Sequence, residues 1–176
     1  MSSPVLLKNK TGINGLGAGV WNIGPGNDPF GGPTREAIPM LDRLPMLAEC
    51  GLSYYEAHDV EITAEMAPEA AKIAKKLGLK CGMYTPSFFA APIFKDGAMT
   101  SNDPVVRKLG LANALKAVDT TMVLGAKTMV FWNGREGFDF VLAKNGRDAF
   151  KRLVEGLNKV GKYSKKNYGT KIKFAI

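Results

Sequence analysis

The chain has 176 residues, of which 45% are hydrophobic and 23% charged, which is ordinary for a single soluble globular domain. No apolar stretch approaches the roughly 20 residues of a membrane-spanning helix, and the two cysteines, Cys50 and Cys81, lack a CxxC spacing. The composition therefore predicts a reduced, cytoplasmic protein with no membrane partner.

The net charge of +8 comes from one segment. Between residues 144 and 173 the chain carries ten of its 24 Lys and Arg residues but only two of its 16 Asp and Glu residues. A basic patch can bind nucleic acid. Aromatic residues are not interleaved with these lysines as a stacking platform requires, so we interpret the segment as the solvated face of a helix and predict no nucleic-acid partner.

The first half of the chain alternates short apolar runs with helical patterns. Pro45 should kink or shorten the first helix, and Gly51 should end it. In chain order we predict a strand at 16–21, a helix at 39–49, a strand at 53–58, a helix at 63–77 and a strand at 80–85.

The second half continues this alternation. Asp103 is a typical N-cap, followed by Pro104 at the first helical position. The predicted elements are a helix to about residue 124, a strand at 128–132, a helix at 147–163 and a strand that begins at 171. The last helix should turn one apolar face inward, made of Phe150, Leu153, Val154, Leu157 and Val160.

Strands that alternate with helices predict an α/β fold with a parallel sheet and helical crossovers. Residues 1–176 supply about four and a half βα units, fewer than the eight of a TIM barrel, which typically needs about 250 residues. A parallel sheet that stops at its fifth strand has an open edge. We therefore expect a missing C-terminal half or a partner that supplies it.

His58 is the only histidine and stands at the predicted C-terminal end of a strand. Catalytic groups of TIM barrels come from such strand ends, and an imidazole can act there as a general acid or base near neutral pH. Glu61, three residues on, could orient it by a hydrogen bond. A purely structural histidine at a strand end explains the position equally well.

Several aromatic residues also fall at or just beyond predicted strand ends. Trp21 and Trp132 follow the first and fourth strands, and Phe89 lies in the loop after the third. Such residues can wall a small-molecule pocket at the mouth of a barrel. Any one of them could instead be ordinary core packing, but their joint placement favours a pocket.

Other motifs are absent from the sequence. Gly15, Gly17 and Gly19 do not keep the GxGxxG spacing, and no helix follows them, which argues against a dinucleotide site. There is no P-loop, no HExxH and no cluster of acids with metal-ligand spacing.

Four ordered segments resemble motifs of the xylose isomerase family, shorter-chain class. The resemblance runs from about Gly19 to Ile176. Its segments are DPFGGPTR at 28–35, AHDVE at 57–61, PIFKDGAMTSND at 92–103 and FWNGREG at 131–137.

This resemblance implies one xylose isomerase-like TIM (β/α)₈ barrel domain, of which residues 1–176 are the N-terminal part, usually assembled as a homotetramer. It implies an aldose–ketose isomerase that interconverts xylose and xylulose, and often glucose and fructose, by a hydride shift assisted by two divalent metals (Mg, Mn or Co). The implied roles are ring opening by His58, its orientation by Glu61, pocket walls from Trp21, Phe89 and Trp132, lining by Thr85, and a contribution of Phe30 to the neighbouring subunit's site.

Some positions depart from the family pattern. Glu61 replaces an Asp, and Asn133 replaces a Gly. The family's first metal-ligand Glu would follow directly after Ile176, so no metal ligand is assigned in this chain, and we expect the isolated chain to be inactive. Two alternatives remain: a half-barrel binding or structural module that oligomerises, and another member of the same superfamily, such as a sugar (phosphate) isomerase or epimerase or an abasic-site endonuclease.

Overall fold

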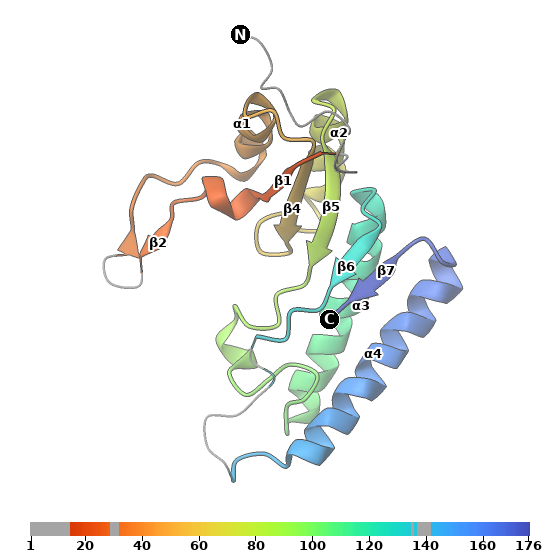
Figure 1. The fold of residues 1–176 in the computed structure, drawn as a ribbon. Coiled ribbons are helices and arrows are strands. Elements are labelled where there is room, and N and C mark those ends of the chain that lie inside the picture. The colour runs from red at the N-terminus through yellow and green to blue at the C-terminus, as the bar shows by residue number, and fades with distance from the viewer. Residues whose placement is uncertain (1–14, 29–31, 135, 137–141) are drawn as a thin grey trace.

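A computed structural model describes residues 15–28, 32–134, 136 and 142–176. Within these ranges, five parallel strands form one twisted sheet in the order β1-β4-β5-β6-β7 (Figure 1). The strands are β1 (Gly17–Gly19), β4 (Tyr54–His58), β5 (Lys80–Thr85), β6 (Thr128–Val130) and β7 (Lys173–Ala175). Each strand pairs with the previous strand of the sheet, so the order in space follows the order in the chain.

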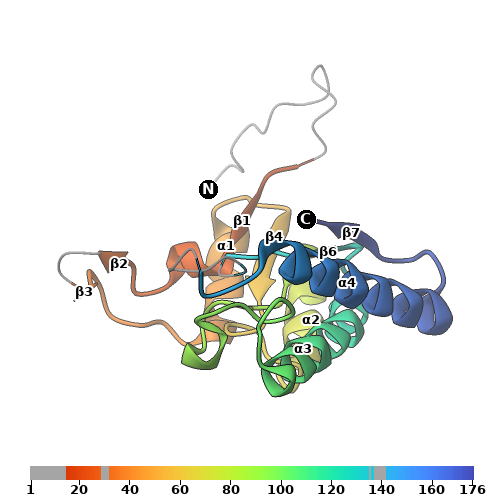
Figure 2. The same ribbon diagram turned by 90° about the horizontal axis from the view of Figure 1, so that it is seen from below.

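The helices line one side of this sheet, as Figure 2 shows, and the pattern is that of part of a barrel wall. They are α1 (Arg43–Glu49), α2 (Ala67–Lys76), α3 (Pro104–Val123) and α4 (Gly146–Tyr168). The hydrophobic core lies between the sheet and these helices. Its largest fully buried side chains include Tyr55, Tyr84, Phe88, Phe94, Leu44, Leu47 and Met129.

The observed elements fit the predicted alternation, with shifts at several ends. β5 and α3 lie where they are predicted, and the Asp103 side chain caps α3 by accepting a hydrogen bond from the Val105 amide at 2.7 Å. The predicted first strand is shorter, because a 3₁₀ helix begins at Val20 and continues to Ile23.

The helix predicted at 39–49 is divided at its start. Met40–Asp42 form a 3₁₀ turn, and α1 begins only at Arg43. The α-helix is therefore shorter than predicted, and Pro45 falls in its first turn, where the missing amide proton removes no intrahelical hydrogen bond. The next helix begins at Ala67 rather than at Thr63.

One prediction about α4 is wrong in part. Phe150 and Val154 were expected to face inward, but they are 68% and 39% exposed. Val160 is fully buried as predicted, and the rest of the buried side of α4 is made by the small residues Ala149, Gly156 and Ser164, which allow close packing. Leu153 and Leu157 pack at the edge of the core as expected.

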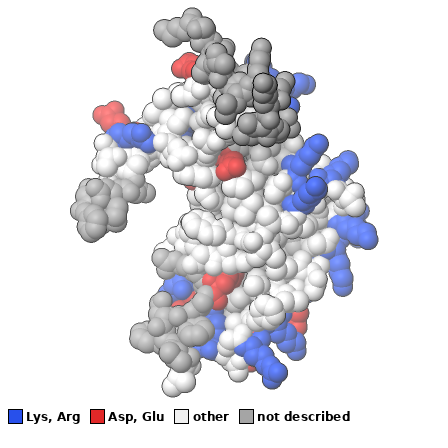
Figure 3. All heavy atoms as spheres, in the orientation of Figure 1, with Lys and Arg blue, Asp and Glu red and all other residues white. Residues whose placement is uncertain are grey.

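The basic segment lies largely on the outer side of α4 and on β7. Figure 3 shows Lys and Arg side chains gathered along the side of the molecule where α4 lies in Figure 1. The exposed lysines of this segment are Lys151, Lys159, Lys162, Lys165, Lys166, Lys171 and Lys173. No helix in the described part of the chain is long and apolar enough to cross a membrane.

A small two-stranded ribbon extends from the N-terminal part of the structure. β2 (Asn27–Asp28) pairs antiparallel with β3 (Gly32–Pro33), which the sequence analysis did not predict. Phe30, which the resemblance assigns to the neighbouring subunit's site, lies outside the described residues.

Candidate active site

The carboxyl ends of the parallel strands bring the predicted site residues to one edge of the sheet. His58 ends β4 and Thr85 ends β5, and the two residues are paired in register. Trp132 lies two residues beyond the end of β6, and Trp21 lies in the 3₁₀ helix that follows β1. Parallel pairing thus gathers residues that are far apart in the sequence.

Trp21 reaches the site by folding back over its own strand. A Cβ atom added to Gly19 would lie only 2.1 Å from atoms of the Trp21 indole, far closer than van der Waals contact. Glycine is therefore required at position 19 for the indole to lie against β1 and next to His58.

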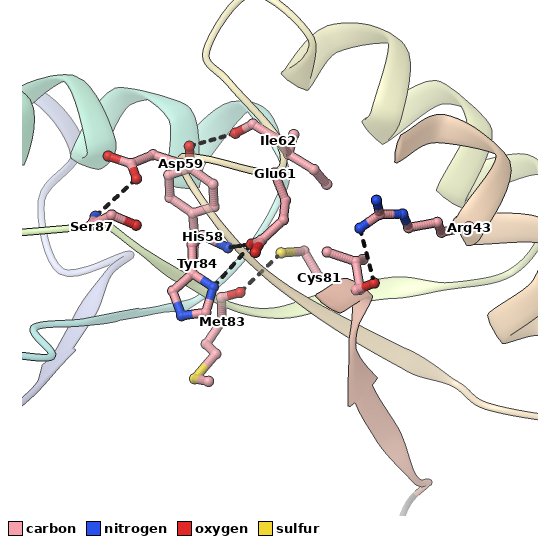
Figure 4. Close-up of polar contacts among 10 residues, drawn as sticks. Arg43, His58, Asp59, Glu61, Ile62, Cys81, Met83, Tyr84 and Ser87 are labelled. Atoms are coloured by element: carbon pink, nitrogen blue, oxygen red, sulfur yellow. Dashed lines mark hydrogen bonds and ion pairs between the residues drawn. The ribbon is translucent and has the colours of Figure 1, made fainter. Parts of the chain in front are cut away.

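Glu61 holds His58 with two hydrogen bonds to one oxygen atom. Its Oε2 accepts from the His58 backbone amide at 2.7 Å and lies 2.9 Å from His58 Nδ1 (Figure 4). Both side chains are mostly buried, at 14% and 17% exposure. Because a carboxylate only accepts hydrogen bonds, Nδ1 carries the proton, and a neutral His58 has its lone pair on Nε2. In Figure 4, Nε2 points away from Glu61.

Three aromatic side chains surround the His58 ring. The centroid distances from His58 are 4.6 Å to Trp21, 6.1 Å to Phe89 and 6.3 Å to Trp132. Phe89 also meets Trp132 edge to face at 4.8 Å. These contacts fix the imidazole from several sides while leaving room in front of it.

The same residues line a cavity of about 440 Å³. This volume falls within the roughly 300–1,000 Å³ usual for small-molecule sites. The complete lining consists of Trp21, His58, Val60, Glu61, Met83, Thr85, Phe89, Val130 and Trp132. The wall is therefore mostly apolar, with His58, Glu61 and Thr85 as its polar groups.

Two hydrogen bonds join the segment that follows β4 to β5 and the residues just after it. The Asp59 carboxylate accepts a hydrogen bond from the Ser87 amide at 2.8 Å, and the Tyr84 hydroxyl donates to the Ile62 carbonyl at 2.7 Å (Figure 4). Burial raises the pKa of Tyr84 well above its usual range, and the nearby Asp59 charge adds to this. The phenol therefore stays protonated and keeps its donor role.

The structure brings together all the predicted site residues that it describes. These are Trp21, His58, Glu61, Thr85, Phe89 and Trp132. Three lining residues were missed: Val60, Met83 and Val130. Strand alternation could have identified two of them, because Met83 lies two residues before Thr85 and Val130 two residues before Trp132.

The described residues do not fit a metal ion. No group of three or more His, Cys, Asp or Glu side chains in residues 15–28, 32–134, 136 and 142–176 could hold one. The Glu61 carboxylate, nearest to the cavity, is already engaged by His58. No chemical step through a metal is therefore derived for this part of the chain.

Comparison with known proteins gives a family and a fold. A family model described as xylose isomerase-like TIM barrel matches residues 44–176. An L-ribulose 3-epimerase structure matches 92% of this chain with a TM-score of 0.64 and 16% identity, over 48% of its own length. A D-allulose 3-epimerase from Methylomonas sp. matches 91% of this chain with a TM-score of 0.61 and 16% identity, over 50% of its length.

A xylose isomerase domain protein from Planctomyces limnophilus is similar as well, with a TM-score of 0.55 and 12% identity over 90% of this chain and 52% of that one. Identities this low show a shared fold and no more. The chain spans about half the length of these solved structures.

Proposed function

We propose a function that starts from one fact: this chain belongs to the xylose isomerase-like TIM barrel family. The proposal is that the cavity at the strand ends binds an unphosphorylated monosaccharide, for an isomerisation or epimerisation that His58 assists. The observation that carries it is the His58–Glu61 pair, which fixes Nδ1 of an imidazole that lines an aromatic-walled cavity of about 440 Å³.

The lining favours a sugar without phosphate groups. Aromatic faces pack against the C–H faces of a sugar ring, and the few polar groups can orient its hydroxyls. No Lys or Arg is among the described residues that line the cavity. A phosphate group would need such a cation or a ring of backbone amides, so this lining argues against a sugar phosphate or a nucleic acid.

His58 is suited to proton transfer at a sugar oxygen. With Nδ1 held by Glu61, only Nε2 can exchange a proton with a ligand in the cavity. Ring opening moves the proton of the anomeric hydroxyl to the ring oxygen as the bond between the anomeric carbon and that oxygen breaks, and a neutral Nε2 can accept the first proton and return it to the ring oxygen. The aromatic walls shield the His58 imidazole, which is 14% exposed, from much of the water and so strengthen its electrostatic interactions.

Two reactions share this first step. Epimerisation at C3 of a ketose is favoured by the structural likeness to ketose 3-epimerases. Interconversion of an aldose and a ketose such as xylose and xylulose is favoured by the loop segments at 28–35, 92–103 and 131–137. An assay of the protein expressed from its gene distinguishes the two reactions. Epimerisation converts D-fructose to its C3 epimer, whereas aldose–ketose interconversion converts D-xylose to a ketose.

The binding proposal can be tested on the chain itself, because His58 is its only histidine. We expect the imidazole resonances in an NMR titration to shift when D-xylose or D-fructose is added, and to stay unchanged with the corresponding sugar phosphates. The matched control is Phe150→Ala, which changes an exposed side chain on α4 and should titrate like the wild type. Imidazole resonances that do not shift on addition of either free sugar would contradict the proposal.

A further inference from the structure

The loop after β5 and the turn after β6 are joined by one carboxylate, that of Glu136. Its two oxygens accept hydrogen bonds from three consecutive backbone amides, those of Ala98 at 3.2 Å, Met99 at 3.2 Å and Thr100 at 3.1 Å. The Thr100 hydroxyl also donates to this carboxylate. A carboxylate held by charge-assisted bonds from several donors is a strong and directional tie.

The backbone around Glu136 is shaped to receive it. Gly97 has a φ of 91°, and a Cβ atom there would lie 2.7 Å from Glu136 Oε2 and 2.3 Å from Thr100 Oγ1. The buried Lys144 side chain donates to the Asp96 carbonyl and, at 3.1 Å, to Thr100 Oγ1. Burial lowers the pKa of Lys144, and the Glu136 charge opposes this, so the carboxylate favours the charged lysine.

The hydrogen bonds of Glu136 lie next to the residues that form the aromatic wall of the cavity. The Glu136 amide donates to the Asn133 carbonyl at 3.2 Å and so closes a turn that begins one residue after Trp132. Within this turn, a Cβ atom at Gly134 would lie 3.6 Å from Phe89 Cβ, which is ordinary contact. Phe89 in turn meets Trp132 at 4.8 Å.

We propose that Glu136 is a positioning residue that holds Trp132 and Phe89 in place as the aromatic wall. It acts by fixing the turn after Trp132 to residues 98–100, and it does not touch the cavity, whose lining omits it. Its effect on ligand affinity rests on the proposed sugar-binding function. Its effect on the position of Trp132 does not.

The competing explanation is that Glu136 only stabilises the loop after β5 and has no influence on the site. The loop after β5 has further contacts that Glu136 does not supply, since Arg152 donates to the Ser101 carbonyl at 3.2 Å and Asn102 donates to the Ala143 carbonyl at 2.8 Å. Loss of Glu136 should therefore leave this loop attached to α4 and free mainly the turn that follows Trp132.

The test uses Glu136→Gln in a Trp21→Phe background, where Trp132 is the single tryptophan. Trp132 is already 56% exposed, and we expect acrylamide quenching of its fluorescence to rise further, because the turn behind it opens more often. In the chain with Trp21 intact, we expect Glu136→Gln to weaken sugar binding about 10- to 100-fold, as misplacement of a binding wall does. Glu155→Gln, an exposed carboxylate on α4, is the control and should change neither value.

Two results would overturn the inference. One is faster hydrogen exchange at the amides of residues 98–100 in Glu136→Gln with unchanged Trp132 quenching, which would mean that Glu136 stabilises only the loop. The other is a folded Glu136→Asp variant, to be used if Glu136→Gln does not fold, whose carboxylate is one methylene too short to reach the three amides and in which Trp132 quenching equals that of the control. If the wild type binds no sugar, the proposed function fails, while the quenching comparison still decides the role of Glu136.

Discussion

The two faces of the five-stranded sheet are built from alternate residues of the same strands, yet they have different surroundings. Tyr55, Tyr84 and Met129 point toward the helices and are at most 1% exposed. His58 and Val130, on the other face, line the cavity. Neighbours in the sequence are thus divided between packing and ligand binding, so a substitution at one position should affect stability and a substitution at the next should affect the site.

The largest expected effect is on the cavity face. Replacing His58 by Asn should lower turnover of the protein expressed from its gene by about 10²–10⁴-fold, the usual contribution of a general acid or base. The unfolding midpoint in urea should change little, because the residue lies at the rim of the core. Turnover within a factor of two of the wild type would show that His58 has only a structural role.

The matched pair Met129 and Val130 tests the division of faces most directly. Met129 is fully buried between sheet and helices, so Met129→Ala should lower the free energy of unfolding by about 2–5 kcal/mol. Val130→Ala removes less buried surface and should mainly alter ligand affinity. Urea denaturation and a ligand titration of both variants check this, and equal losses of stability would contradict it.

A smaller effect is expected at the glycine under Trp21. Gly19→Ala places a methyl group where the indole lies, so Trp21 should move from its place beside His58, and ligand affinity should fall about tenfold, or ~1.4 kcal/mol. The control is Gly82→Ala in β5, where the added Cβ would be 3.6 Å from its nearest neighbour, an ordinary contact. Calorimetric titration compares the two, and a full-affinity Gly19→Ala variant with an unmoved Trp21 would refute the packing argument.

The smallest expected effect is on the stability of the fold at high pH, through a contact between α3 and α4. Tyr163 and Tyr168 on α4 both donate to the Asp119 carboxylate on α3, at 2.9 and 2.8 Å. The hydrogen bond to Asp119 is the main cause that raises the pKa of Tyr168 to about 12. A phenol with a raised pKa stabilises the fold at pH values below its unfolded pKa of about 10, and this contribution is lost as the pH rises from about 10 to 12.

Tyr168→Phe should therefore be slightly less stable than the wild type at pH 9, with a difference that disappears toward pH 12. Urea midpoints measured across this range check the sign. A difference that stays constant with pH would mean that the hydroxyl does not couple to folding. Ligand affinity at neutral pH should be unchanged, because Tyr168 lies on the helix side of the sheet.

Local signals in the sequence predicted the parts of the fold that depend on neighbouring residues. β5 begins and ends as expected because its apolar run is bounded by a glycine-ended helix and a proline, and α3 begins after Asp103 because that side chain caps it. His58, Thr85 and Trp132 could be assigned to one site because parallel strands end at one edge.

Features that depend on contacts between distant segments were not predicted. The exposure of Phe150 follows from how closely α4 packs through Gly156, where a Cβ atom would lie 2.7 Å from Met99 Sδ. The contact of Glu136 with residues 98–100 joins segments more than 35 residues apart in the sequence.

The sequential strand order has a consequence for how the molecule forms. Each strand from β4 to β7 adds to the outer edge of the strand that precedes it in the sheet, and none is inserted between two strands already paired. A ribosome releases the chain from its N-terminus, so every newly emerged strand would find its template already exposed. The sheet can therefore grow in one direction during synthesis, one βα unit at a time, without earlier pairings having to open.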